Sequence, residues 1–81
     1  MGVIKMNINI HKFLEQFNKE YNFLYENDFV AGKEQAVAEF DRLIKNENFA
    51  NFVGEFAKFR GDFISSDREA AAFMFALSEL G

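Results

Sequence analysis

Apolar side chains recur along most of the chain at steps of three and four residues, which is the period of an amphipathic α-helix. The pattern predicts four helices, at about residues 10–26, 29–45, 49–61 and 67–80. Asn9 and Asn48 are suitable N-caps for the first and third helices, because a short side-chain oxygen can accept a free backbone N–H of the first turn. Ser66 and Glu69 fit a capping box ahead of the fourth helix.

The third predicted helix carries a series of phenylalanines separated by alternating steps of three and four residues. They are Phe49, Phe52, Phe56, Phe59 and Phe63. Because this spacing keeps side chains on one face, we expect a buried seam with Phe52 and Phe56 as core residues. A second series, of small residues, lies on nearly the opposite side: Ala50, Gly54, Ala57 and Gly61. Either the close approach of another backbone or a merely exposed face would account for Gly54, and Gly61 fits a helix C-cap.

The segment from Ala70 to Leu77 is apolar around the whole helix circumference, which is typical of a helix buried on all sides. The breaks between the predicted helices are short, so neighbouring helices should run antiparallel. The sequence therefore predicts an all-α fold in a single domain over residues 10–81. This fold is a compact four-helix bundle, either regular or irregular.

The first ten residues follow a different period. Ile4, Met6, Ile8 and Ile10 alternate with polar residues, as in a β-strand. Nothing downstream could pair with this strand, so residues 1–9 are expected to form an extended arm that could pair only with another chain. The competing interpretation is a frayed terminus, with residues 1–5 as an extension ahead of a natural start at Met6.

The amino-acid composition argues against several classes of function. The 81 residues include no Cys and a single His, His11. Disulfides, thiolate nucleophiles and zinc ribbons are therefore excluded, most enzyme classes are disfavoured, and no enzyme activity, cofactor or metal is expected. A net charge of −4 disfavours nucleic acid as a partner. No apolar run approaches the roughly 20 residues of a membrane span, so we expect a cytoplasmic protein without a membrane partner.

The candidate binding residues come from an excess of aromatic side chains. Twelve Phe residues in so short a chain are more than a small core can bury, so some should meet another chain. Phe23 and Phe75 fall away from the main apolar faces of their helices. The segment from residue 20 to residue 28 contains Phe23 with Glu20, Glu26 and Asp28 and no base, which suits a partner with a basic surface. Phe75 is the candidate contact of a homo-oligomer, expected to be a dimer.

Two function hypotheses lead, besides a purely structural subunit of a larger complex. The first is a small acidic protein-binding module that occludes or scaffolds a partner protein, such as a phage- or mobile-element-encoded inhibitor of a bacterial defence enzyme. The alternative is a dimeric transcription regulator or antitoxin of the ribbon-helix-helix kind, in which paired N-terminal strands enter the major groove. In that case Lys5, Asn7 and Asn9 would face the bases, although the negative net charge argues against DNA binding.

Overall fold

The computed structural model describes residues 8–80 and contains four α-helices. These are α1 (Ile10–Glu26), α2 (Lys33–Leu43), α3 (Glu47–Arg60) and α4 (Asp67–Leu80). No β-strand occurs within residues 8–80, so the predicted all-α fold is confirmed. Most of the expected N-terminal arm lies outside the described residues. Ile8 and Asn9 precede α1 in a non-helical conformation.

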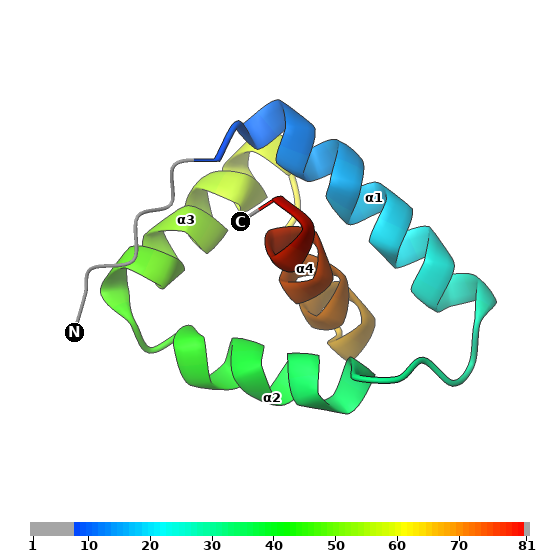
Figure 1. Ribbon diagram of the computed structural model, residues 1–81. Helices are drawn as coiled ribbons and strands as arrows, with labels where there is room; N and C mark the ends of the chain where they lie inside the picture. The colour runs from blue at the N-terminus through cyan, green and yellow to red at the C-terminus, as the bar shows by residue number, and fades with distance from the viewer. Residues whose placement is uncertain (1–7, 81) are drawn as a thin grey trace.

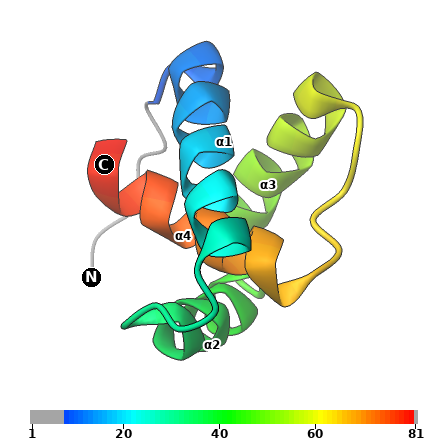
Figure 2. The ribbon, with the colours of Figure 1, turned by 90° about the vertical axis from the view of Figure 1, so that its right-hand side faces the viewer.

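Helix α4 runs through the middle of the molecule, and the other three helices surround it (Figure 1). A view turned by 90° shows α1 and α3 on one side of α4 and α2 on the other (Figure 2). The bundle is therefore irregular, with α4 packed mainly against α1 and α2. The apolar circumference of α4 explains this central place, since Ala71, Ala72, Phe73 and Ala76 have no exposed surface.

The core is built of phenylalanine rings around Phe73 on α4. Its ring meets five others edge to face, with centroids 4.8 to 5.8 Å apart. These rings belong to Phe13 on α1, Phe40 on α2, and Phe49, Phe52 and Phe56 on α3. Edge-to-face pairs contribute about 0.5–1.5 kcal/mol each beyond the area they bury. Phe73 therefore joins all four helices in one cluster.

The helix ends agree with the sequence for α1 and α4 and differ for α2. The Asn9 side chain accepts hydrogen bonds from the backbone N–H groups of His11 and Lys12, at 2.9 and 3.1 Å, as an N-cap should. Helix α2 was expected from residue 29 and begins only at Lys33. The reason is Gly32, which has a left-handed φ of 85° and breaks the helical path ahead of the first turn.

Helix α3 begins earlier than expected and buries a shorter seam. Its N-cap is Asn46 in place of Asn48, with the Asn46 side chain accepting from the Phe49 N–H at 3.1 Å. Phe52 and Phe56 are buried as predicted, whereas Phe59 and Phe63 are 42% and 77% exposed.

The predicted seam extends past the helix, because α3 ends at Arg60 and Phe63 lies beyond that end. Gly61, with a left-handed φ of 86°, turns the chain away, and its N–H bonds the Ala57 carbonyl in the expected C-cap.

The connection from α3 to α4 is held by an ion pair that the sequence did not predict. Arg60 Nη1 lies 2.9 Å from Glu69 Oε2, and Arg60 Nη2 donates to the Phe63 carbonyl at 2.8 Å. The guanidinium also covers the ring of Phe17, at 5.0 Å from its centroid. This pair ties the connection to α4 and to the aromatic core.

Glu69 also helps to begin α4. Its N–H donates to Ser66 Oγ at 3.1 Å, which is one half of the expected capping box. Its carboxylate accepts from Ser65, at 2.8 Å from the backbone N and 3.1 Å from Oγ, instead of from the Ser66 N–H. Burial raises the pKa of Glu69, but the hydrogen bonds from Ser65 and Arg60 outweigh this effect and hold the pKa below its ordinary value.

Candidate functional site

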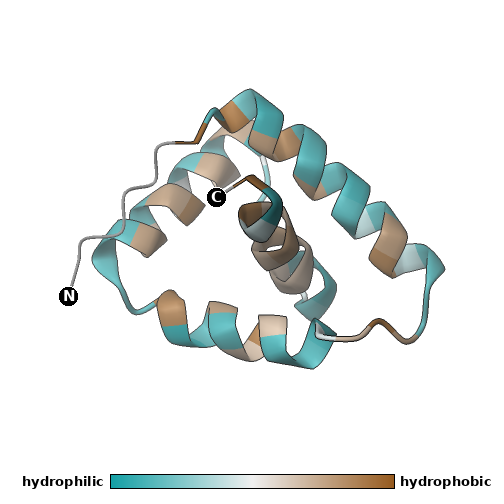
Figure 3. Cartoon of the chain, viewed as in Figure 1, coloured by the Kyte–Doolittle hydropathy of each residue, from teal (hydrophilic) through white to brown (hydrophobic). Residues whose placement is uncertain are grey.

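The candidate site lies where α1 ends and the chain turns toward α2. The Asn27 side chain donates a hydrogen bond to the Phe23 carbonyl at 2.8 Å, which satisfies one of the free carbonyls of the last helical turn. Beyond Asn27 the chain continues without helix until Gly32. Figure 3 shows apolar residues in this connection between hydrophilic helix ends. Of these apolar residues, Val30 packs against the core, whereas Phe29 is exposed.

Phe29 is the most exposed large apolar residue of this connection. It was expected in the apolar stripe of a longer second helix, but its side chain is 96% exposed because α2 begins four residues later. Phe23, on α1, is 50% exposed, in agreement with its position away from the apolar face. The Gly32 that displaces the start of α2 was the one signal in the sequence that could have revealed Phe29.

Three carboxylates accompany these two rings. Glu20, Phe23 and Glu26 follow one another at steps of three residues, so they lie along one side of α1. Glu26 and Asp28 are exposed, whereas Glu20 is half-buried and accepts a hydrogen bond from Gln16 Nε2 at 2.7 Å. No Lys or Arg occurs between residues 20 and 32. We name this group the α1-end surface: Glu20, Phe23, Glu26, Asp28 and Phe29.

Tyr25 lies on a different side of α1 from Phe23, since residues two positions apart point in nearly opposite directions on a helix. The Arg68 guanidinium of α4 lies 5.0 Å from the centroid of the Tyr25 ring and 5.9 Å from that of Tyr21. Such stacking of a cation on an aromatic face is favourable. Tyr25 is thus already engaged within the chain, although 65% of it remains exposed.

The structure does not place Phe75 with the other predicted binding residues. Phe75 belongs to the central helix α4, where it is half-buried and packs against the aromatic core. It is therefore less exposed than its position outside the main stripe suggested, because three helices surround α4. Its contribution to self-association stays a prediction.

Other candidate chemistry is sparse. His11 is exposed at the start of α1, and its ring meets Phe59 edge to face at 4.7 Å. No group of three or more His, Asp or Glu side chains within residues 8–80 is arranged to hold a metal ion. No helix in the same part of the chain is long and apolar enough to cross a membrane.

The tripeptide Arg60-Gly61-Asp62 matches an integrin-binding sequence, but chance is the better explanation for it. Arg60 is partly buried and is held by Glu69 and the Phe63 carbonyl. An integrin-binding sequence would instead need a free arginine in an exposed loop.

The fold and the exposed residues define an irregular four-helix protein with an acidic, aromatic surface at one end of α1. Comparison with protein families, with curated proteins and with solved structures found no match. The functional argument therefore rests on the surface of this chain alone.

Proposed function

We propose that this protein is a binding module whose α1-end surface docks onto the basic surface of a partner protein, and that it acts by occluding or scaffolding that partner. The observation that carries the proposal is Phe29, a ring 96% exposed to water in the connection that follows α1, the helix of the half-exposed Phe23. Large exposed aromatic groups at the centre of an interface supply much of its binding energy, because their contact excludes water over a large area.

The charges around the two rings indicate the kind of partner. Glu26 and Asp28 are exposed next to Phe23 and Phe29 in a segment without a base. Carboxylates at the rim of an aromatic contact speed the encounter with a positively charged surface and disfavour acidic competitors. An inhibitor or adaptor encoded by a phage or mobile element would be a protein of this kind.

Site-specific photocrosslinking tests the proposal. A photoreactive phenylalanine analogue would replace Phe23 or Phe29 in separate variants, and a control variant would carry the same analogue at Ala38, an exposed position on α2. After irradiation in the source cells, adducts are identified by mass spectrometry. We expect positions 23 and 29 to capture the same protein, with a basic surface, and position 38 not to capture it. Equal capture at all three positions, or none at 23 and 29, would refute the proposal.

The ribbon-helix-helix alternative depends on residues 1–9, of which only Ile8 and Asn9 are described. It requires DNA binding, so the same crosslinking experiment separates the two hypotheses. Adducts of DNA from an analogue placed at Asn7, together with none at positions 23 and 29, would favour the regulator over the protein-binding module.

A further inference from the structure

Helix α3 carries a groove on the side that faces away from the phenylalanine core. A hollow of about 480 Å³ and a neighbouring one of about 370 Å³ share Lys58 and Phe63 in their walls. We call the two together the α3 groove. Gly54, Glu55, Ala57 and Asp62 also line it.

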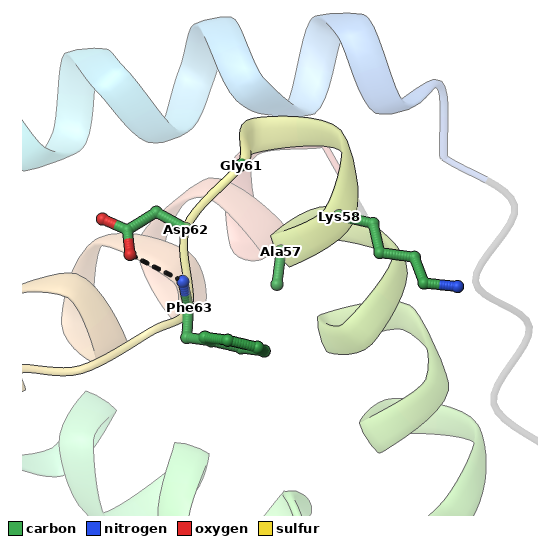
Figure 4. Close-up of a pocket in the computed structure, with 5 residues that line it drawn as sticks. All are labelled: Ala57, Lys58, Gly61, Asp62 and Phe63. Atoms are coloured by element: carbon green, nitrogen blue, oxygen red, sulfur yellow. Dashed lines mark hydrogen bonds between the residues drawn. The ribbon is translucent and has the colours of Figure 1, made fainter.

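The aromatic wall of the groove is open to water. Figure 4 shows the Phe63 ring beside α3, on the same side as Ala57, while Lys58 extends away from it. The Phe63 side chain is 77% exposed, although its N–H is fixed by a 2.9 Å bond to the Asp62 carboxylate. The groove thus combines an exposed ring on a held backbone with a helix face of short side chains.

Gly54, on the floor of the groove, is not explained by packing against the part of the chain that the structure describes. A Cβ placed there would meet no atom of residues 8–80 within 4 Å. Glycine inside a helix costs about 1 kcal/mol relative to alanine, so the position is unfavourable for the isolated helix. A second backbone lying in the groove would make use of the missing side chain.

The charges of the groove match a second copy of the same groove. Glu55 and Lys58 lie one helical turn apart and are exposed, and neither forms a salt bridge within residues 8–80. If a second α3 lies antiparallel across this turn, Glu55 of each copy faces Lys58 of the other, so two ion pairs form across the interface. A parallel copy would place Glu55 against Glu55. The pattern is therefore complementary to itself under two-fold symmetry.

We propose that the α3 groove is the interface of a symmetric dimer, in which the two α3 helices cross antiparallel near Glu55 and Lys58 and cover both Phe63 rings. This inference does not depend on the proposed function, because it uses a different surface.

The area that the two α3 helices can bury limits the affinity of the dimer. A helix of 14 residues is about 21 Å long. One helix face of that length buries less than the roughly 800 Å² per partner of a standard stable interface. The dimer therefore belongs to the transient class, with a dissociation constant on the order of 10–100 µM.

Sedimentation velocity from about 5 µM to 1 mM, on either side of that dissociation constant, tests the proposal with the whole chain. Gly54→Gln fills the floor of the groove where the monomer has room, so it should weaken the dimer by at least about tenfold with the melting temperature kept or raised. Ala38→Gln, on the exposed side of α2, is the matched control and should leave the dimer unchanged.

Charge variants test the orientation. Lys58→Glu replaces both attractions with repulsions and should weaken the dimer about tenfold or more, whereas Glu55→Lys combined with Lys58→Glu restores the matching charges and should recover it to within about threefold. Lys45→Glu, on the exposed connection before α3, controls for net charge. A wild-type chain that stays monomeric at 1 mM would overturn the proposal. So would a dimer that tolerates Gly54→Gln, or one that the double charge reversal fails to restore.

Discussion

The phenylalanine series that begins in α3 contains buried and exposed residues, and the variants Phe56→Ala and Phe63→Ala test this difference. Both residues share the spacing that predicted one buried seam, yet Phe56 is fully buried and Phe63 is 77% exposed. Phe56 packs edge to face against Phe13, Phe17 and Phe73, with centroids 5.0 to 5.5 Å apart. Its removal takes away a buried ring and leaves a cavity, which should cost about 3–5 kcal/mol.

That loss is large for a chain of this size. At about 0.05–0.15 kcal/mol per residue, the whole domain has a free energy of unfolding of roughly 4–12 kcal/mol. Phe63→Ala removes an exposed side chain and should change the stability by no more than about 0.5 kcal/mol. Urea denaturation followed by far-ultraviolet circular dichroism measures both. A loss below about 1 kcal/mol for Phe56→Ala, or similar losses for the two variants, would refute the packing described here.

Two further predictions concern single interactions. The pKa of Glu69 lies below its ordinary value of 4.5 in the folded chain, so this carboxyl contributes stability that is complete above pH 4.5 and is lost as the pH falls through the lowered pKa. In urea melts from pH 6 to about pH 3, the free energy of unfolding should fall less steeply with pH for Glu69→Gln than for wild type or for an exposed Glu15→Gln control. Equal pH dependence in all three proteins would contradict the assignment. Asn9→Ala removes the N-cap of α1 and should cost about 0.5–2 kcal/mol in the same assay, and a loss no larger than that of the exposed Asn18→Ala would argue against the cap.

Local patterns predicted most of the fold. The apolar periodicity located all four helices, and the apolar circumference of the segment from Ala70 to Leu77 indicated that the last helix would be buried. Asn9, Ser66 and Gly61 marked helix ends because capping depends on residues adjacent in the sequence. Helix periodicity and helix capping depend on residues that are close together in the sequence, so both can be predicted from one sequence.

The sequence-based predictions were wrong or incomplete where the structure depends on one backbone angle or on a contact between residues far apart in the sequence. Phe29 and Phe63 have the spacing of core residues, but Gly32 and Gly61 take left-handed conformations and end the helical register beside them. The Arg60–Glu69 pair joins two helices across a connection, and no periodicity predicts such a pair. For the candidate site, the sequence identified Phe23 and its acidic neighbours but not Phe29, because it assigned Phe29 to the second helix.

One binding measurement tests the central claim most directly. The partner captured by photocrosslinking is purified, and its dissociation constant is measured with the wild-type chain and with Phe29→Ala. Phe29 is 96% exposed in the isolated chain, so its removal should leave the melting temperature unchanged. If Phe29 anchors the partner, binding should weaken by about 1–3 kcal/mol, which is about 5- to 150-fold in the dissociation constant. An unchanged dissociation constant for Phe29→Ala would contradict the claim that the α1-end surface binds the partner.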